Sequence, residues 1–436
     1  MSSGPDFDPL ARFRDSKWTA GVIGLGYVGL PLLLTVVKAG LQGIGFDVSS
    51  ELVSELNAGK SHIDDVSDED VEKALADGTE FTTDYRLLSD ADVIFLCVPS
   101  PLGRNRQPDL SFIEAAASTV EQVIRPGQLV VLESTSYPGT TEDYLLPAVE
   151  RAGLVVDRDV FVAFSPERVS PGHDLKTAEI PKVVGGVTEL SGKVAEVVYR
   201  RLVPSVHLVS SARAAEMTKL LENTYRSVNI GLINEMAQLS HKLGIDIWEV
   251  VDAAATKPFG FQAFYPGPGA GGHCIPLDPQ YLAWRAREAN FSTLFIDIAE
   301  QVNTKMPSYI VLRISDLLND HGLPVFGSDI LGVGIAYKSD IADDRESASL
   351  EVLGELAHRG ARISVLDLVI GRDRVRSHGY AAVSPDDDFS SFALAAILTD
   401  HSSVDYERLA REIPVVFDAR GVYRRLGIEA DNVVPL

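Results

Sequence analysis

The chain has 436 residues, 45% of them hydrophobic and 23% charged, which is enough apolar sequence for two or three domains and excludes an extended disordered protein. Its 39 basic and 62 acidic residues give a net charge of −23, which argues against nucleic acid and anionic membranes as partners. Two cysteines form no disulfide framework, and residues 1–18 lack the apolar segment of a secretory signal. We therefore expect a cytoplasmic protein that begins with a frayed tail over residues 1–17.

Strand-like and helix-like segments alternate through the first part of the chain. Apolar runs of strand length lie at residues 19–23, 42–46, 93–98, 129–132 and 160–164, and helical patterns lie at residues 29–39, 67–76 and 111–124. This alternation predicts a parallel sheet with helices on both faces. The apolar stretch 22–46 is rich in glycine and contains Lys38 and Gln42, so a buried strand, turn, helix and strand explain it better than a membrane span.

The middle of the chain is predicted to be helical. Residues 212–243 contain no proline and one glycine, Gly231, and their apolar residues recur at helical spacing, which predicts one long helix or two in tandem. A further helix is expected at residues 247–255, a glycine- and proline-rich loop at 257–279, and helices at 281–289 and 296–318.

The last part repeats the pattern of the first in weaker form. Strands are expected at residues 329–336, 362–366, 392–398 and 415–417, and a helix at 349–358. The predicted fold class is α/β, with two Rossmann-like doubly wound domains joined by a helical central domain that has a long connecting helix. The expected boundaries are residues 18–210, 211–310 and 311–436 for the first, central and last domains.

A glycine pattern typical of dinucleotide sites follows the first predicted strand and opens the next helix. It runs Gly24-Leu-Gly26-Tyr27-Val28-Gly29. The first glycine allows a tight turn, the second lets the backbone approach a pyrophosphate, and the third lets the helix pack on the strand. The second strand ends at Asp47, a carboxylate that would bind ribose hydroxyls and repel a 2′-phosphate, which favours NAD over NADP. The alternative is a glycine-rich turn of another α/β protein.

A second glycine-rich segment, residues 266–279, surrounds Cys274. Dense glycines would bring backbone amides close to a ligand, so that a Cys274 thiolate could attack a carbonyl carbon of that ligand. Asp278 could orient a proton carrier or a water. The ordinary role of a lone cysteine is that of a small buried hydrophobe, which suits Cys97 at the end of an apolar strand. We expect no metal site at His273, because the nine histidines form no HxH or HExxH group.

Taken in order, these segments resemble the UDP-glucose/GDP-mannose dehydrogenase family over nearly the whole chain. The matching pieces are the Gly24 fingerprint, Ser134-Thr135, Ser165-Pro166-Glu167-Arg168, Lys219-Leu-Leu-Glu-Asn223, the Cys274 loop, Gly334-Ile-Ala-Tyr337-Lys338 and Asp344-Arg345-Glu346-Ser347. Their joint order is specific, although no single piece is.

The resemblance implies an oxidation that removes four electrons from the C6 alcohol of a nucleotide-diphosphate sugar and uses two NAD. A first oxidation would give an aldehyde, which Cys274 would trap as a thiohemiacetal. A second oxidation would give a thioester, which water would hydrolyse to a uronate. An aldehyde held covalently on the enzyme cannot escape, which agrees with the presence of a thiol.

The resemblance also assigns catalytic roles residue by residue. Lys219 and Asn223, four residues apart on one helix face, would stabilise an oxyanion and hold water. Glu167 would be the general base for thioester hydrolysis, and Thr135 and Asp278 would bind the water network. Without the resemblance, Lys219 and Asn223 would be ordinary polar positions of a helix.

The binding residues implied by the resemblance fall into two groups. The cofactor group consists of Gly24, Gly26, Tyr27, Val28, Gly29, Asp47, Pro99, Ser134, Thr135 and Arg345. The substrate group consists of Glu167, Arg168, Val169, Lys219, Asn223, Lys257, Tyr265, Gly269, Gly271, Gly272, Tyr337 and Lys338. A surface ion pair is the alternative role for Arg345, because acidic residues flank it.

Two departures from the glucose-type members bear on the sugar. Those members carry a second acid where this chain has Pro171, and an arginine before the cysteine loop, for which Lys257 is the nearest cation. The runs PERVSPG and KPFGFQAFYPG resemble instead the UDP-N-acetylglucosamine 6-dehydrogenase branch. We therefore expect UDP-N-acetylglucosamine as substrate, with UDP-glucose or dTDP-glucose, as in polysaccharide or secondary-metabolite pathways, as the alternative.

Two other functions share part of this pattern. A two-electron hydroxyacid or sugar dehydrogenase would carry the dinucleotide motif but need no thiol. A protein that binds NAD and a nucleotide sugar without catalysis would not need the polar residues found here. The resemblance also implies a homodimer or a larger homo-oligomer, built on the apolar face of the helix that begins near Ala212.

Overall fold

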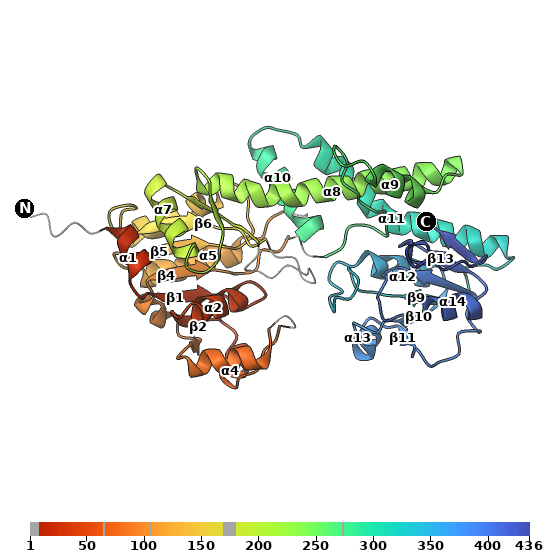
Figure 1. Ribbon diagram of the computed structural model, residues 1–436, viewed down its shortest axis with the longest axis horizontal. Coiled ribbons are helices and arrows are strands. Elements are labelled where there is room, and N and C mark those ends of the chain that lie inside the picture. The colour runs from red at the N-terminus through yellow and green to blue at the C-terminus, as the bar shows by residue number, and fades with distance from the viewer. Residues whose placement is uncertain (1–7, 64–65, 104–106, 169–179, 273) are drawn as a thin grey trace, which may run out of the picture. The chain divides into compact units, whose positions relative to one another are not determined.

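Two sheets form the framework of the chain (Figure 1). The computed structural model describes residues 8–63, 66–103, 107–168, 180–272 and 274–436. Unit 1 comprises the residues up to Glu222 together with Gln280–Asn290, and unit 2 comprises Asn223–Pro279 together with Phe291–Leu436. No helix in this described part of the chain is long and apolar enough to cross a membrane.

The sheet of unit 1 has the strand order β3-β2-β1-β4-β5-β6-β7-β8. Its strands are β1 (Thr19–Ile23), β2 (Gln42–Phe46), β3 (Glu80–Thr82), β4 (Val93–Leu96), β5 (Leu129–Leu132), β6 (Phe161–Phe164), β7 (Lys182–Gly186) and β8 (Val206–Leu208). All neighbours pair in parallel except β6 and β7. The first six strands have the order typical of dinucleotide-binding domains.

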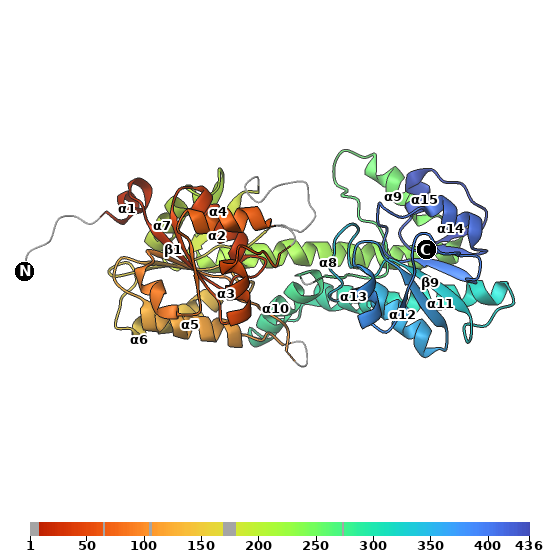
Figure 2. The same ribbon diagram turned by 90° about the horizontal axis from the view of Figure 1, so that it is seen from below.

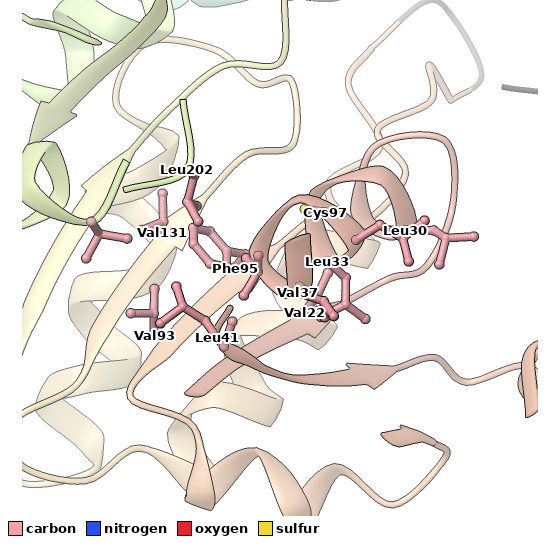
Figure 3. Close-up of a cluster of buried hydrophobic side chains, with 14 of the residues drawn as sticks. Val22, Leu30, Leu33, Val37, Leu41, Val93, Phe95, Cys97, Val131 and Leu202 are labelled. Carbon is pink, nitrogen blue, oxygen red and sulfur yellow. The ribbon is translucent and has the colours of Figure 1, made fainter. Parts of the chain in front are cut away.

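Helices cover both faces of this sheet, which explains why β4, β5 and β6 are continuous apolar runs. They are α2 (Gly29–Lys38), α3 (Ser50–Asn57), α4 (Asp68–Ala76), η1 (Tyr85–Asp90), α5 (Ser111–Val123), η3 (Thr141–Leu145), α6 (Leu146–Arg151) and α7 (Glu189–Tyr199). On one face, Leu33 of α2 shares a buried cluster with Val22 and Phe95 (Figure 3). On the other face, α5 and α6 form a second buried cluster with the sheet.

α1 (Pro9–Asp15) corrects the expectation of a frayed tail over residues 1–17. Phe13 and Trp18 are buried in the same cluster as α2, and the indole N–H of Trp18 donates to the carbonyl of Phe13. Arg12 forms an ion pair with Asp92 at 2.5 Å. The expectation is wrong for residues 8–17, because these side chains tie the segment to the core; residues 1–7 lie outside the described residues.

α8 (Ala212–Leu243) is one uninterrupted helix of 32 residues, and Figure 2 shows it along its length. α9 (Ile247–Ala255) has the predicted bounds, whereas α10 (Cys274–Glu288) and α11 (Leu294–Asp320) begin earlier than predicted. Within unit 2, a Cβ on Gly231 of α8 would lie 3.1 Å from the Cα of Ala299, so glycine lets α8 and α11 approach closely.

The sheet of unit 2 repeats the dinucleotide-binding order as β11-β10-β9-β12-β13-β14, which confirms the predicted fold class. Its strands are β9 (Asp329–Val333), β10 (Arg362–Leu366), β11 (Ala381–Ala382), β12 (Leu394–Ile397), β13 (Val416–Asp418) and β14 (Val433–Pro435). α11 and α12 (Ala348–His358) pack on one face, and α14 (Tyr406–Glu412) and α15 (Val422–Leu426) pack on the other. β9 ends at Val333 rather than at residue 336, because Gly334 turns the chain with a φ of 79°.

A buried carboxylate holds the segment that precedes α12. Asp344 is 7% exposed and accepts hydrogen bonds from Arg374 at 2.8 and 2.9 Å and from His378 at 2.6 Å. Arg374 lies on α13 (Arg372–Ser377), and His378 follows this helix. Hydrogen bonds from Arg374 lower the pKa of Asp344, burial opposes them, and with His378 the pKa settles at about 2.

Replacing Asp344 by asparagine is expected to destabilise unit 2 in a pH-dependent manner. The folded-state pKa is depressed, so the ionised carboxylate stabilises the fold above its ordinary pKa of 3.8, and this contribution is lost as the pH falls toward 2. The urea midpoint of Asp344→Asn should lie below that of the wild type at pH 7, and the two should converge below pH 4. Asp373→Asn, at a fully exposed carboxylate of α13, is the matched control. A midpoint difference that stays constant with pH would contradict this account.

Candidate active site

In the glycine turn after β1, two glycines have no room for a side chain, and the third borders open space. Gly24 has a φ of 90°, and a Cβ there would lie 2.6 Å from the carbonyl oxygen of Cys97. A Cβ on Gly29 would lie 1.8 Å from the carbonyl oxygen of Gly24, so glycine lets α2 begin directly against the turn. By contrast, a Cβ on Gly26 would meet no atom of the described chain within 4 Å, its chain neighbours aside. The space beside Gly26 fits a pyrophosphate, which the amides at the start of α2 favour.

Asp47 is fixed beside this turn by backbone amides. Its Oδ2 accepts the N–H of Leu25 at 2.9 Å, and its Oδ1 accepts the N–H of Ser49 at 3.0 Å. The N–H of Gly24 donates to the carbonyl of Phe46, which joins the turn to the end of β2. The structure therefore brings the carboxylate and the glycine turn together, in an arrangement that fits NAD.

Five other residues expected at the cofactor follow β1, β4 and β5 at the same edge of the sheet. Ser134 is buried, and both its N–H and its hydroxyl donate to the carbonyl at the end of β4. Thr135 is partly buried, whereas Pro99 is exposed. Tyr27 is 55% exposed, next to the open position at Gly26, and Val28 is partly buried.

Glu167 lies in unit 1 beside two charged residues that the sequence analysis missed. Its Oε2 lies 3.0 Å from Nζ of Lys182, and the same Nζ lies 2.7 Å from Oε2 of Glu133. Lys219 donates from Nζ to the backbone carbonyl of Glu167 at 2.5 Å, so the structure brings these two predicted residues together. Glu133 directly follows β5 and Lys182 opens β7. A charged residue flanking a buried strand is the one local signal that could have indicated them.

Burial shifts the pKa values of Glu133, Lys182 and the nearby Cys97. Burial raises the pKa of Glu133, although the charge of Lys182 opposes this. Burial lowers the pKa of Lys182, but the attraction of Glu133 and Glu167 outweighs it, and the net pKa is raised. The pKa of the nearby Cys97 thiol is also raised by burial, so this cysteine stays protonated, in keeping with the predicted small buried hydrophobe.

Arg168 forms a bidentate ion pair with Glu222 of α8, with contacts of 2.5 and 3.2 Å. It also donates to the carbonyl of Pro181 at 2.7 Å. The guanidinium thus joins the segment after β6 to the start of β7 and to α8. Val169 and Pro171, which the sequence analysis singled out, lie outside the described residues.

Cys274 is exposed and is the first residue of α10, in unit 2. The expectation of a loop up to residue 279 is therefore wrong, because Pro279 is accommodated inside the helix. Asp278, four residues on, is 3% exposed and accepts a hydrogen bond from Nδ2 of Asn223 on α8. Thus Asn223 and Asp278 come together, and Cys274 occupies a helix N-terminus, where the helix dipole favours a negative charge. His273 lies outside the described residues.

The glycines before Cys274 have a packing role that the sequence did not reveal. A Cβ on Gly271 would lie 2.9 Å from the Cβ of Tyr337, and one on Gly272 would lie 2.8 Å from its ring. Gly269 and Gly272 also have φ angles of 145° and 82°. These glycines are therefore required for the loop to fit against Tyr337, in addition to any contact with a ligand.

Lys338 and Arg345 lie in unit 2 in different surroundings. Lys338 is half-buried, and burial, followed by repulsion from Arg226, lowers its pKa. Arg345 forms a bidentate ion pair with Asp343 at 2.9 and 2.6 Å, and its side chain is 48% exposed. The ion pair that the sequence analysis gave as the alternative for Arg345 is thus present.

Lys257 and Tyr265 flank the exposed aromatic segment after α9. Nζ of Lys257 lies 4.9 Å from the centroid of the Phe259 ring. The ring of Tyr265 stacks on Trp248 at 5.7 Å, and its hydroxyl donates to Asp252 at 2.9 Å. Tyr265 is therefore held against α9 of unit 2.

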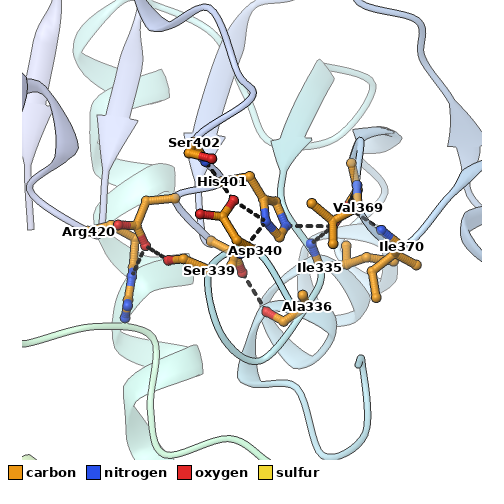
Figure 4. Close-up of polar contacts among 12 residues, drawn as sticks. Ile335, Ala336, Ser339, Asp340, Val369, Ile370, His401, Ser402 and Arg420 are labelled. Atoms are coloured by element: carbon orange, nitrogen blue, oxygen red, sulfur yellow. Dashed lines mark hydrogen bonds and ion pairs between the residues drawn. The ribbon is translucent and has the colours of Figure 1, made fainter. Parts of the chain in front are cut away.

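The strand ends of the second sheet carry a buried polar network (Figure 4). Asp367, after β10, accepts the N–H of Ile335 at 2.8 Å and lies 3.2 Å from Nε2 of His401. Nδ1 of His401 accepts the N–H of Asp340 at 2.9 Å, which assigns the imidazole proton to Nε2. Asp367 thus takes the position in this sheet that Asp47 takes in the first.

The dinucleotide pattern itself is not repeated in unit 2. Ala336 stands where the open Gly26 stands in unit 1, and the next helix, α12, does not begin until Ala348. The open glycine turn therefore belongs to unit 1, whereas Arg345 of the expected cofactor group lies in unit 2. Within the described ranges, no group of three or more His, Cys, Asp and Glu side chains is arranged to hold a metal ion.

Three successive segments match the domains of one family. Residues 19–203 match the NAD binding domain, residues 213–305 the central domain and residues 331–425 the UDP binding domain of the UDP-glucose/GDP-mannose dehydrogenases. The chain belongs to the UDP-glucose/GDP-mannose dehydrogenase family. It is accordingly an NAD-dependent nucleotide-sugar dehydrogenase, and its UDP binding domain indicates a nucleotide-sugar substrate.

Relatives resemble this dehydrogenase over most of their length. Protein CapL of Staphylococcus aureus is 35% identical, over 92% of this chain and 95% of its own. The UDP-N-acetyl-D-glucosamine 6-dehydrogenase of Pseudomonas aeruginosa is 34% identical, over 83% and 86%. The structure of a UDP-D-ManNAc dehydrogenase from Pyrococcus horikoshii superposes with a TM-score of 0.85 at 30% identity, over 96% and 98%.

The open position at Gly26 yields a matched pair of variants. Gly26→Ala should fold with an unchanged melting temperature, because its Cβ meets no described protein atom, but it should raise the Kd for NAD about tenfold or more, which is about 1.4 kcal/mol. Gly29→Ala should instead lower the melting temperature, because its Cβ collides with backbone. Thermal unfolding and titration calorimetry with NAD check both. Unchanged NAD affinity in Gly26→Ala would exclude this turn as the pyrophosphate site.

Proposed function

We propose that this dehydrogenase oxidises the C6 alcohol of UDP-N-acetylglucosamine to a uronate in two steps, with Cys274 as covalent nucleophile. The observation that carries the proposal is the exposed thiol at the first residue of α10, four residues before the buried Asp278 and its partner Asn223. A thiol that served only as a core hydrophobe would be buried, as Cys97 is.

The proposed sequence removes four electrons from the sugar and consumes one water. NAD, when bound, accepts a hydride in each of the two oxidations, so two molecules are consumed per sugar. The Cys274 thiolate adds to the aldehyde carbon of the first product and forms a thiohemiacetal, which the second oxidation converts into a thioester. Water then attacks the thioester carbon, the C–S bond breaks, and the thiolate and a carboxylate are released.

The remaining polar residues take the roles that the family resemblance implies. Lys219, only 8% exposed, is a buried cation that can stabilise an oxyanion. Asn223 and Asp278, which share a hydrogen bond, hold and orient water, and Thr135 keeps the water-binding role that the resemblance implies. Glu167 accepts the proton of the water that hydrolyses the thioester. Its carboxylate is 20% exposed, which leaves it accessible.

The proposed binding sites use the cofactor group and the substrate group that the resemblance implies. The glycine turn, Asp47 and the residues at the ends of β4 and β5 hold NAD. The half-buried Lys338 supplies a cation for the nucleotide sugar, and the other residues of the substrate group keep the binding role that the resemblance implies. The corresponding domains are residues 18–210 for NAD, 211–310 for the cysteine loop and 311–436 for the nucleotide sugar. Cys97 and Cys274 form no disulfide with each other, which suits a reducing, cytoplasmic location.

The choice of an N-acetylated sugar rests on the segments around Glu167 and Lys257, and the names of the relatives support it. The relative from Pseudomonas aeruginosa is named for UDP-N-acetyl-D-glucosamine, and the structure from Pyrococcus horikoshii for UDP-D-ManNAc. UDP-glucose and dTDP-glucose are the alternatives if the acetamido group is not recognised.

We also propose a homodimer in which α8 packs against a second copy. Four large apolar side chains of this helix, Tyr225, Leu232, Leu239 and Leu243, are between 47% and 62% exposed. Their separations of seven, seven and four residues place them on one stripe of the helix. Such a stripe is the kind of surface that self-association buries.

The substrate and the stoichiometry are tested together. Purified protein with NAD should form two NADH per uronate from UDP-N-acetylglucosamine, and less from UDP-N-acetylmannosamine, UDP-glucose, dTDP-glucose or GDP-mannose. Cys274→Ser should form no uronate, because its hydroxyl cannot supply the thioester. Absorbance of NADH and chromatography of the sugar product measure both quantities, and Cys97→Ala is the matched control that should keep the stoichiometry.

One NADH per product would move the assignment to a two-electron enzyme, and full uronate formation by Cys274→Ser would remove the covalent route. Binding of NAD and sugar nucleotide without NADH formation across the panel would favour a non-catalytic binder.

The α8 stripe predicts the oligomeric state. Leu232→Glu should shift the protein from dimer to monomer in light scattering, because a charge in an apolar contact is costly to bury. Asp320→Glu, at the end of α11, is a conservative control that should leave the dimer intact. A wild-type protein that is monomeric at micromolar concentration would overturn this proposal.

A further inference from the structure

A line of polar side chains runs from the core of unit 1 to Glu167. Tyr199, wholly buried at the end of α7, donates its hydroxyl to Oε1 of Glu133. Nζ of Lys182 donates to Oε2 of Glu133 at 2.7 Å and to Oε2 of Glu167 at 3.0 Å. The side chains of Glu133, Lys182 and Glu167 are 0%, 9% and 20% exposed, so exposure increases along the line.

The charges of this line do not balance. Burial raises the pKa of Glu133, but both of its oxygens accept a hydrogen bond, and these bonds and the charge of Lys182 favour its ionised form. One ammonium is therefore shared by two carboxylates, and the formal charge of Glu133, Lys182 and Glu167 together is −1. If Lys182 faced Glu167 alone, its full attraction would favour the ionised carboxylate and make Glu167 a weak proton acceptor. The charge of Glu133 offsets part of that attraction.

We propose that Glu133 and Lys182 are positioning residues that hold the Glu167 carboxylate and set its affinity for a proton. Lys182 fixes the place of the carboxylate, and Glu133 keeps Lys182 from suppressing its basicity. This inference rests on the proposed function, in which Glu167 is the base for thioester hydrolysis. It adds two residues that no motif of the sequence analysis contains.

Other groups near Glu167 have fixed partners of their own. Arg168 is paired with Glu222, and Lys219 contacts the backbone carbonyl of Glu167. The titratable and charged groups that the described chain gathers around Glu167 and its partners are Cys97, Glu133, Arg168, Lys182, Tyr199, Lys219 and Glu222. Lys182 forms an ion pair with the Glu167 carboxylate, and Glu133 is the second partner of Lys182.

The test is a double-variant cycle on the pH profile of kcat for uronate formation. Glu133→Gln keeps the shape of the side chain and removes one negative charge, so the acidic limb should move to lower pH by about 1 unit. Lys182→Met removes the positive charge, so the limb should move to higher pH by a similar amount. The double variant removes both charges and should return the limb close to its wild-type position. Lys182→Arg keeps the charge and should rescue the profile of Lys182→Met.

A purely structural role makes a different prediction. Variants of residues with a structural role alone would lower kcat by the same factor at every pH and leave the acidic limb in place. That result would overturn the inference. Shifts of the limb in the same direction in both single variants would also overturn it. If Lys182→Met fails to fold, Glu133→Gln, Lys182→Arg and the neutral double variant still decide the sign of the shift.

A second measurement separates this inference from the proposed function. Titration of the Glu167 carboxyl by NMR, with ¹³Cδ-labelled glutamate and assignment through Glu167→Gln, requires no turnover. The proton affinity of Glu167 should fall in Glu133→Gln whether or not the protein makes a uronate. An unchanged titration overturns the inference, whereas a shifted titration in a protein without uronate formation upholds the charge coupling and overturns the proposed reaction alone.

Discussion

A glycine turn at the carboxyl end of the first strand determines the geometry of both units. Gly24 and Gly334 have positive φ angles, and a Cβ on either would collide with backbone that follows the fourth strand of its sheet. In each sheet, an aspartate after the second strand accepts the amide that follows the glycine, namely Leu25 or Ile335. This constraint brings three strand ends together. In unit 1 it leaves an open backbone surface at the start of α2, whereas in unit 2 Ala336 and a longer segment replace that surface.

In the proposed function, local cations such as Lys219 and Lys338 bind the anionic ligand of this strongly acidic chain. Lys219 and Lys182 are buried and both contact Glu167, whereas Lys338 is half-buried. The net charge of −23 therefore excludes broad electrostatic attraction to polyanions without excluding a nucleotide sugar. In the Glu133–Lys182–Glu167 line, too, we propose that the neighbouring charges, rather than the net charge of the chain, set the proton affinity of Glu167.

The sequence predicted those features whose signal is local. The turn glycines and Asp47 could be placed because a strand, a turn and a helix follow one another directly, and α8 because its helical spacing is unbroken. The start of α10 at Cys274 was missed, because prolines at 276 and 279 resemble a loop. The packing role of Gly271 and Gly272 depends on Tyr337, more than 60 residues away in the chain. Glu133 and Lys182 are adjacent only because β5, β6 and β7 are neighbours in the sheet, which no motif expresses.

The central claim is that Cys274 carries the sugar as a covalent acyl intermediate. The most direct measurement is intact and peptide mass spectrometry of Glu167→Gln, quenched in acid after mixing with NAD and UDP-N-acetylglucosamine. The account predicts a uronyl adduct on the peptide that contains Cys274, released by hydroxylamine and absent from Cys274→Ser. Continued NADH formation by Glu167→Gln with an unmodified Cys274 peptide throughout the time course would contradict it.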